Sequence, residues 1–225
     1  MTTSGTFAFT LTVSEMVEEA FERCGKLPSE LKFEHLNSAR RSFNLMFADW
    51  SNKGVKQWAI ERYTQTVTIA DVDYALPTGG IDILSMVVRR DSIDTPMVRI
   101  SREEYLELPD KTLAGRPSNF FVDRRINTPI IYLWNAPENS TDQIIYDYIR
   151  RLEDVGSPTY NVDTPYRWTE AVCAGLAAML CVKFAPERLS MLKMQAMETF
   201  DSAFFEDRDR ASTVMDVKYD RGYRA

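Results

Sequence analysis

The spacing of apolar residues changes twice along this chain, and that change limits the possible folds more than any single motif does. Over residues 13–24 and 29–52, apolar side chains recur every three or four positions, the spacing of a helix that buries one face. From residue 55 to about residue 152, apolar residues instead form short β-branched and aromatic runs with turn residues between them. Helical spacing returns after residue 163. The order of helix pair, β segment and helix pair predicts an α+β protein.

The predicted helices begin or end at residues of the expected kinds. Thr12–Glu15 fits a capping box, in which the threonine and glutamate side chains bond the first turn's free backbone groups. Gly25 and Gly54 are typical residues for the ends of the first and second helices. Pro165 opens a third helix that runs to about Phe184, and Ala185-Pro186 separates it from the last one.

The β segment lacks the long helices that a doubly wound parallel sheet needs between its strands. A second capping box at Ser101–Glu104 predicts only one brief helix. We therefore predict an antiparallel sandwich or barrel-like module. Its strands are predicted in the runs TQTVTIA, IDILSMVVRR, TPMVRIS, SNFFVDRR, TPIIYLW and DQIIYDYIRRL.

Neither helix pair can bury its apolar faces alone, which predicts that the two pairs form one bundle. The resulting division assigns residues 1–54 and 155–210 to a helical bundle and residues 55–154 to an inserted β module. Residues 211–225 form an extended C-terminal arm in this interpretation. Within it, Met215–Asp220 alternates apolar and charged residues, as in a half-buried strand. Without a neighbouring strand run, it is either a strand that pairs with another molecule or a frayed terminus.

Few residues in this chain have the chemistry of a catalytic or metal site. The chain has a single histidine, His35, so every histidine-dependent triad or metal cluster would need it. We expect His35 to be a surface residue of the second helix. Glu18 and Glu19 are consecutive helix residues and are not expected to share a face. We predict no catalytic, cofactor-binding or metal-binding residue.

The composition of the chain argues against several further classes of protein. Net charge is −6, so the chain lacks the basic surface of a protein that coats duplex DNA. The longest apolar run, residues 171–182, is too short to span a bilayer. The three cysteines do not make an even disulfide framework and are expected to be reduced thiols in the core. No secretory signal is expected, because the first residues lack a positive region followed by an apolar one.

The stretch YALPTGGIDIL, residues 74–84, contains a proline and two glycines between apolar runs, as some phosphate-binding loops do. It has neither the Walker spacing G-x-x-x-x-G-K-[ST] nor the dinucleotide spacing G-x-G-x-x-G. The residues after it predict a strand rather than a helix whose N-terminus would meet phosphate. We therefore interpret the stretch as a turn between two strands.

Paired arginines recur at 40–41, 89–90, 124–125 and 150–151. Three of these pairs fall at the ends of predicted strands. Because the net charge is negative, we expect the arginines to be solvated or paired with neighbouring carboxylates rather than to bind nucleic acid.

Several segments follow one another in a distinctive order and spacing between about Val13 and Asp207. They are ARRSFNLMFADWSNKG, QWAIERYTQTVTIADVDYALP, IDILSMVVRRD, ISREEYLELPDKTLAGRPSNFFVDRR, IYLWNAPENS and TPYRWTEAVCAGLAAMLCVKF. In this order they resemble the head-to-tail adaptors, or tail accessory factors, of tailed bacteriophages. The Tyr-x-Leu-Pro element, the Gly-Arg-Pro-Ser turn and the Leu-Trp-Asn-Ala-Pro strand end carry most of the resemblance.

The resemblance implies a non-enzymatic structural protein of the virion neck, made in the host cytoplasm. Such adaptors form a ring, here a dodecamer, beneath the portal protein and extend the DNA channel toward the tail nozzle or tail tube. They retain packaged DNA, which passes through the lumen without specific binding, and they need no membrane or cofactor. Their C-terminal arm docks on the portal or a neighbouring subunit, a role that here falls to Met215, Val217, Tyr219 and Tyr223.

Two other functions stay open at this point. The first is a carbohydrate-binding module or enzyme with an aromatic cleft around Phe120, Phe121, Tyr132 and Trp134, although strand aromatics at this spacing are more often core residues. The second is a DNA-binding protein, which predicts a steep salt dependence of its affinity for duplex.

Overall fold

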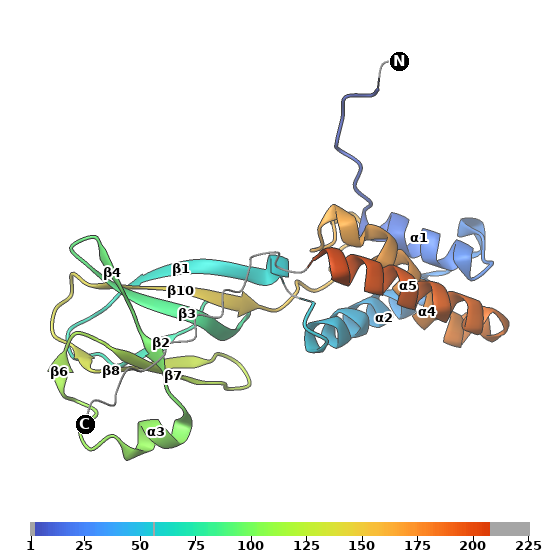
Figure 1. The fold of residues 1–225 in the computed structure, drawn as a ribbon. Coiled ribbons are helices and arrows are strands. Elements are labelled where there is room, and N and C mark those ends of the chain that lie inside the picture. Colours follow the sequence, from blue (N-terminus) through green and yellow to red (C-terminus); the bar gives the residue numbers. More distant parts are fainter. Residues whose placement is uncertain (1–2, 56, 208–225) are drawn as a thin grey trace, which may run out of the picture.

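The computed structural model describes residues 3–55 and 57–207, and its elements confirm the α+β class. The helices are α1 (Val13–Arg23), α2 (Phe33–Asn52), α3 (Arg102–Glu107), α4 (Thr169–Phe184) and α5 (Leu189–Glu206). The strands are β1 (Ile60–Thr66), β2 (Asp73–Ala75), β3 (Gly80–Arg90), β4 (Ile93–Pro96), β5 (Val98–Arg99), β6 (Ala114–Gly115), β7 (Asn119–Asp123), β8 (Ile130–Trp134), β9 (Ala136–Pro137) and β10 (Gln143–Arg150). Figure 1 shows α1, α2, α4 and α5 gathered at one end of the molecule and the strands, with α3, at the other.

Both predicted capping boxes are present, whereas two helices begin later than predicted. The Thr12 N–H donates to Glu15 Oε2 at 2.8 Å, and the Glu15 N–H donates to Thr12 Oγ1 at 3.3 Å. The second helix begins at Phe33 rather than near residue 29, because residues 28–30 form a separate 3-10 turn after which the chain is extended. The helix predicted to open at Pro165, which is α4, likewise begins only at Thr169, after a 3-10 turn over residues 166–168.

The helical core is organised around α4, which is apolar on nearly every side. Helices α1, α2 and α5 all pack against it, so α4 contacts elements from both ends of the sequence. Trp168, just before α4, is fully buried, with its ring 5.3 Å from that of Trp50 and 5.6 Å from that of Phe200. At Gly175 the helices α2 and α4 approach so closely that an added Cβ would lie 2.8 Å from Met46 Sδ. A larger residue there would force the Met46 side chain to move, so the packing favours glycine.

The strands form two four-stranded sheets, ordered β1-β10-β3-β4 and β2-β8-β7-β5, and a two-stranded pair β6-β9. Most neighbours are antiparallel, as predicted, but β5 pairs with β7 and β6 pairs with β9 in parallel. A parallel pair needs a crossover connection of about a dozen residues or more. The β5–β7 crossover contains α3, and the β6–β9 connection contains β7 and β8. The pairing is therefore antiparallel, as predicted for the module, except at these two short pairs.

A second apolar core lies among the strands and is separate from the helical one. Its members come from both four-stranded sheets and include Ile83, Val88, Phe120, Ile131, Leu133, Ile144 and Tyr146. The chain enters and leaves the strands through Val55, Ala59, Leu152 and Val155, which belong to the helical core. The two ends of the β segment therefore lie together against the helices.

The residues YALPTGGIDIL form the predicted turn, and the chain passes there from one sheet to the other. The Gly80 N–H donates to the Pro77 carbonyl at 2.9 Å, which closes a four-residue turn. Gly79 occupies its third position with a φ of +82°, the left-handed conformation that a type II turn requires there. The strand β3 follows directly, so no helix N-terminus faces this loop.

We predict that Leu180→Ala, in the middle of α4, lowers the free energy of unfolding by about 3 kcal/mol, because Leu180 is fully buried and the surrounding helices cannot close the cavity. Urea denaturation followed by tryptophan fluorescence measures the change. Val182→Ala, on an exposed position of the same helix, is the matched control and should change stability by less than about 0.5 kcal/mol. Equal losses in the two variants would contradict the central position of α4.

Candidate interaction surfaces

The four residues predicted to contact a partner, Met215, Val217, Tyr219 and Tyr223, lie outside the described residues. The same holds for the predicted strand Met215–Asp220 and the arm from residue 211. These assignments stay predictions. The described residues themselves form several surfaces that are open to a partner.

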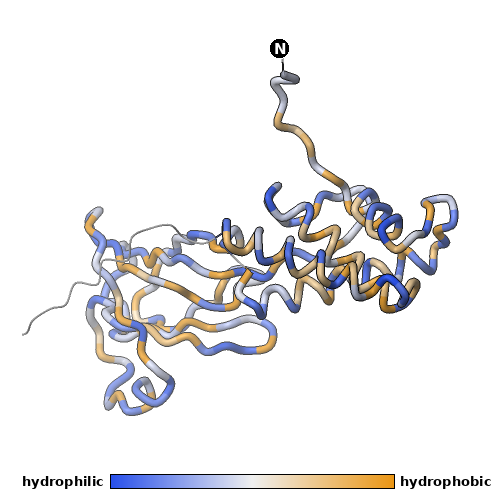
Figure 2. The backbone as a smooth tube through the Cα atoms, turned by 45° about the vertical axis from the view of Figure 1, so that its right-hand side comes forward, coloured by the Kyte–Doolittle hydropathy of each residue, from blue (hydrophilic) through white to orange (hydrophobic). Residues whose placement is uncertain are grey.

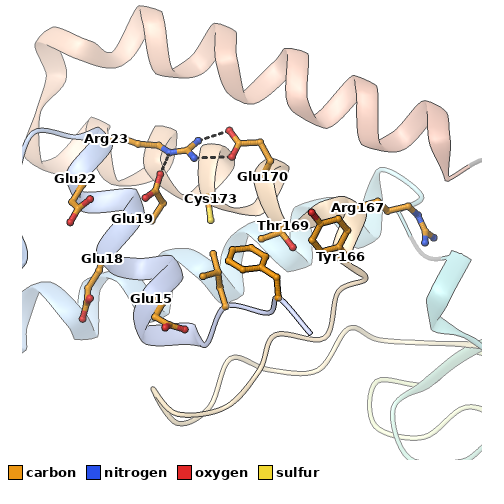
Figure 3. A pocket seen from close by; sticks show the side chains of 12 residues that line it. Glu15, Glu18, Glu19, Glu22, Arg23, Tyr166, Arg167, Thr169, Glu170 and Cys173 are labelled. Carbon is orange, nitrogen blue, oxygen red and sulfur yellow. Dashed lines mark hydrogen bonds and ion pairs between the residues drawn. The ribbon is translucent and has the colours of Figure 1, made fainter. Parts of the chain in front are cut away.

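A groove of about 600 Å³ runs along α1 where the N-terminal segment and the start of α4 meet it (Figure 3). Four glutamates of α1 line it at helical spacing, namely Glu15, Glu18, Glu19 and Glu22. The expectation that Glu18 and Glu19 do not share a face is wrong for this surface. Residues i, i+3, i+4 and i+7 form one stripe along a helix, and together with Glu15 and Glu22 the two residues complete it.

Arg23 is the positive charge that balances part of this stripe. Its guanidinium donates two hydrogen bonds of 2.8 Å to the Glu170 carboxylate of α4 and one of 2.8 Å to Glu19. The hydrogen bonds from Arg23 lower the pKa of Glu170, and the backbone N–H of Thr12 lowers the pKa of Glu15. Both carboxylates are therefore ionised at neutral pH, so the groove carries net negative charge.

The groove has the chemistry of a binding surface rather than of a catalytic site. Cys173 lines it, but burial raises the pKa of this thiol to about 11, so it is not a thiolate at neutral pH. Within residues 3–55 and 57–207, no group of three or more His, Cys, Asp or Glu side chains is placed to hold a metal ion. All three cysteines are buried and unpaired, as predicted.

His35 caps a helix rather than lying free on its surface. Its Nδ1 accepts a hydrogen bond from the Lys32 N–H at 3.1 Å, which satisfies one of the free donors at the start of α2. The half-buried ring lies edge-on to Phe184, with 5.2 Å between centroids. The expectation of a surface histidine was therefore wrong in part, because α4 packs over the start of α2.

The four strand aromatics proposed for a cleft do not share one face. Phe120 points into the core between the sheets, because alternate residues of β7 face opposite ways. Phe121 and Tyr132 lie on the other face, where Tyr105 of α3 packs on both at 5.5 and 5.4 Å. Trp134 donates its indole N–H to the Asp110 carbonyl at 3.0 Å. The aromatics are thus divided between the core and a patch covered by α3. Phe120 is a core residue, which is the more common position for strand aromatics at this spacing.

Two exposed apolar surfaces were missed in the sequence. On α5, Met191, Met194 and Met197 are spaced three residues apart and are all exposed. Before α1, Phe7 and Phe9 project from an extended segment, and Phe7 is 101% exposed. The signal for the second surface was the strict alternation of TFAFTLT, which has the period of a strand although a helix follows directly.

Comparison with known families bears on these surfaces. A family model described as SU10 adaptor protein matches residues 11–218, which is most of the chain. The chain belongs to the SU10 adaptor protein family. Among curated proteins none matches it.

Membership of the SU10 adaptor family confirms the resemblance to phage head-to-tail adaptors and makes the chain a structural component of a phage particle. An adaptor of this kind associates with portal and tail components. In the described part of this adaptor, no helix combines the length and hydropathy needed to cross a membrane.

The arginines at strand ends of the adaptor are largely paired with carboxylates, as predicted. Asp82, which is nearly buried, accepts a hydrogen bond from Arg99 at 2.9 Å and another from Arg124. Burial alone would raise the pKa of Asp82, but the bonds from Arg124 and Arg99 outweigh it and lower the pKa. Arg150 similarly joins Glu61 and Asp163, at 2.7 and 2.5 Å.

Asp142 makes the most buried of these pairs. Its side chain is fully buried and accepts hydrogen bonds from Arg90, with Nε at 2.9 Å and Nη2 at 2.7 Å. Glu138 contacts the remaining Arg90 nitrogen at 2.7 Å. The hydrogen bonds from Arg90 hold the pKa of Asp142 below its usual value. These arginines are therefore committed to internal contacts.

We predict that Asp142→Asn destabilises the adaptor at neutral pH by about 2 kcal/mol, because Arg90 loses a buried, charged acceptor. A lowered pKa contributes stability above the unfolded value of about 3.9, and this contribution is lost as the pH falls through the folded pKa. The stability difference between wild type and variant should therefore shrink toward zero below about pH 4. Urea denaturation at a series of pH values measures it.

The control for this prediction is Asp94→Asn. Asp94 also receives two bonds from an arginine, Arg89, but both side chains are solvent-exposed, so the loss should be much smaller. A difference for Asp142→Asn that stays constant down to pH 2.5 would contradict the assignment of a low pKa to Asp142.

Proposed function

We propose that this adaptor assembles as a dodecameric ring beneath the portal protein of a phage head. The ring extends the DNA channel, retains packaged DNA and presents the docking surface for a tail nozzle or tail tube. The chain acts without catalysis, assembles in the host cytoplasm and remains in the neck of the virion. Family membership over residues 11–218 is the observation that carries this proposal.

The shape of the subunit supports a role between two partners. Its helices and its strands gather at opposite ends (Figure 1), and each end has an apolar core of its own. We propose that residues 1–54 and 155–210 act as the bundle and residues 55–154 as the inserted β module. Each end then offers a separate surface to a neighbour in the particle.

The charge distribution supports a channel through which DNA passes without specific binding. The net charge is −6, and the acidic stripe on α1 repels phosphate groups. Arg90, Arg99, Arg124 and Arg150 are held in internal ion pairs and are not free to release counterions from DNA. Arg40 and Arg41 of α2, by contrast, are exposed and make no ion pair among the described residues.

We propose that the arm, residues 211–225, docks on the portal or on a neighbouring subunit through Met215, Val217, Tyr219 and Tyr223. Fifteen residues reach about 50 Å when extended, which is enough to cross onto another subunit. Apolar and charged residues alternate over 215–220. This pattern suits a strand whose apolar side lies against a neighbouring surface while its charged side faces solvent.

Deletion of residues 211–225 should leave a folded monomer that no longer binds portal rings, because the arm supplies the contact while the two cores lie elsewhere. Co-sedimentation of the purified adaptor with portal rings measures binding, and circular dichroism checks the fold. Electron microscopy of the wild-type mixture tests the ring itself.

The matched control for the deletion keeps the full arm and replaces its four contact residues by serine. Both variants should lose binding if the side chains make the contact. Undiminished co-sedimentation of the deletion variant would exclude the arm from this role. A wild-type mixture without rings in electron micrographs would contradict the proposed function as a whole.

A further inference from the structure

The segment from Thr6 to Leu11, ahead of α1, has the sequence pattern of a strand but joins no sheet in the described part of the chain. Its residues alternate strictly, with Phe7, Phe9 and Leu11 on one side and small or hydroxylated residues on the other. None of its side chains is charged. Figures 1 and 2 both show the segment leading away from the helices, and Figure 2 shows apolar positions along it.

The backbone of this segment is left open in the described structure. Among residues 3–55 and 57–207, pairing with another part of the chain begins only at Thr12, which bridges to Asn161, and at Val13, whose N–H donates to the Tyr160 carbonyl at 2.9 Å. Phe9 touches the Tyr166 ring edge-on at 6.4 Å, and Phe7 is 101% exposed. An extended, uncharged run with free N–H and C=O groups has the requirements of a strand that adds to a sheet edge.

One edge of the described sheets is long enough to receive such a strand. The four edge strands of the four-stranded sheets are β1, β2, β4 and β5, with seven, three, four and two residues. An arm of six residues needs a partner of similar length to pair along its whole run, and β1 provides it. Every residue of β1 pairs with β10 on one side, so its alternate backbone groups face away from the sheet on the other.

The side chains of β1 favour an apolar neighbour at this edge. Tyr63 faces the same side as the buried Tyr146, at 5.7 Å between ring centroids, yet it is 43% exposed because β1 is the edge strand of its sheet among residues 3–55 and 57–207. The charged residues of β1 are turned to β10, since Arg62 pairs with Asp147 and Glu61 with Arg150. The charges that often protect an edge strand are thus already neutralised within the sheet.

We propose that residues 6–11 add as a strand to the free edge of β1 in a neighbouring copy of this chain, with the phenylalanines covering the open flank beside Tyr63. Figure 1 shows the segment leading away from its own β1, and the segment is held at Thr12, which bridges to Asn161 in the connection before α4. Six residues span about 20 Å, so the arm can cross to an adjacent subunit. Because the donor and acceptor surfaces differ, each copy gives one arm and receives one, which is the geometry of a ring.

This inference rests on the proposed ring and names one contact within it. The test uses two full-length proteins, Ala8→Cys and Thr64→Cys, mixed under mild oxidation with and without portal rings. Each copy then carries one added thiol, so a disulfide between the two proteins can form only between copies. The native thiols are buried, and burial raises the pKa of Cys24 and Cys173 to about 11, so the wild-type protein gives the background.

The matched control replaces Thr64→Cys by Thr95→Cys, a threonine that is also exposed and lies on β4, the opposite edge of the same sheet. Strand addition to β1 should give about tenfold more disulfide-linked dimer with Thr64→Cys than with Thr95→Cys, because docking raises the effective concentration of the two thiols. Equal yields, or no dimer above background in either condition, would overturn the proposal. A yield that favours Thr95→Cys would assign the arm to β4 and likewise overturn it.

Two further variants separate strand addition from a merely apolar contact. Ala8→Pro removes a backbone donor inside the arm and should abolish the disulfide that a Thr10→Cys arm forms with Thr64→Cys, so the Thr10→Cys protein is compared with and without the proline. Phe7→Ser should reduce ring assembly on portal, whereas Ile126→Ser, which removes an apolar side chain that is 102% exposed in the β segment, should not. Identical behaviour of the two serine variants would count against the arm.

The failures of the two proposals are distinguishable. Portal-bound rings without the Ala8–Thr64 disulfide would leave the adaptor function in place and exclude strand addition. The disulfide in the absence of portal binding would support strand addition and contradict the proposed adaptor function.

Discussion

The burial of α4 is the constraint on which the rest of the structure depends. This helix has no polar face, so it must be covered by α1 and α2 from one end of the sequence and by α5 from the other. The β segment lies between α2 and α4 in the chain, so this packing also brings its two ends together. Val55 and Ala59 meet Leu152 and Val155 in the helical core, directly beside the first and last long strands. The full-length pairing of β1 with β10 follows from this closure, and the sheet that contains β3 is built on β10.

Local signals predicted the elements whose formation is decided locally. The capping boxes at Thr12 and Ser101 and the turn at Gly79 depend on residues within a few positions, and the structure contains all three. The parallel pairing of β5 with β7 depends on distant neighbours instead. The sequence indicated that arginines at strand ends would find carboxylates, but not that Asp82 would serve both Arg99 and Arg124. The topology of the fold decides which carboxylate each arginine meets. The periodicity of the sequence alone does not reveal that topology.

The candidate surfaces were harder to predict than the fold, for reasons that differ from one surface to the next. The acidic stripe is not apparent from the neighbouring pair Glu18 and Glu19, because it extends over two helical turns from Glu15 to Glu22. The N-terminal segment was missed because its alternation is short and is followed at once by a helix cap. In both cases the signal was present in the spacing of residues. The identity of the partners has no such signal, because an exposed surface shows that something can cover it but not which molecule does.

Some polar and apolar groups of this adaptor have partners within the chain and others do not, and this difference indicates how copies of the adaptor would hold together. The strand-end arginines of the β segment are bound internally, so salt bridges between copies would first require these pairs to break. A net charge of −6 also makes identical subunits repel one another over a Debye length of about 8 Å at physiological ionic strength. The uncharged groups that remain available are the backbone of β1 and of the N-terminal segment and the exposed apolar side chains. Contacts of this kind act only at short range, whereas the repulsion acts further out. Subunits with these properties would stay apart when free and join once a larger partner holds them in register, which is the behaviour that an ordered head assembly requires.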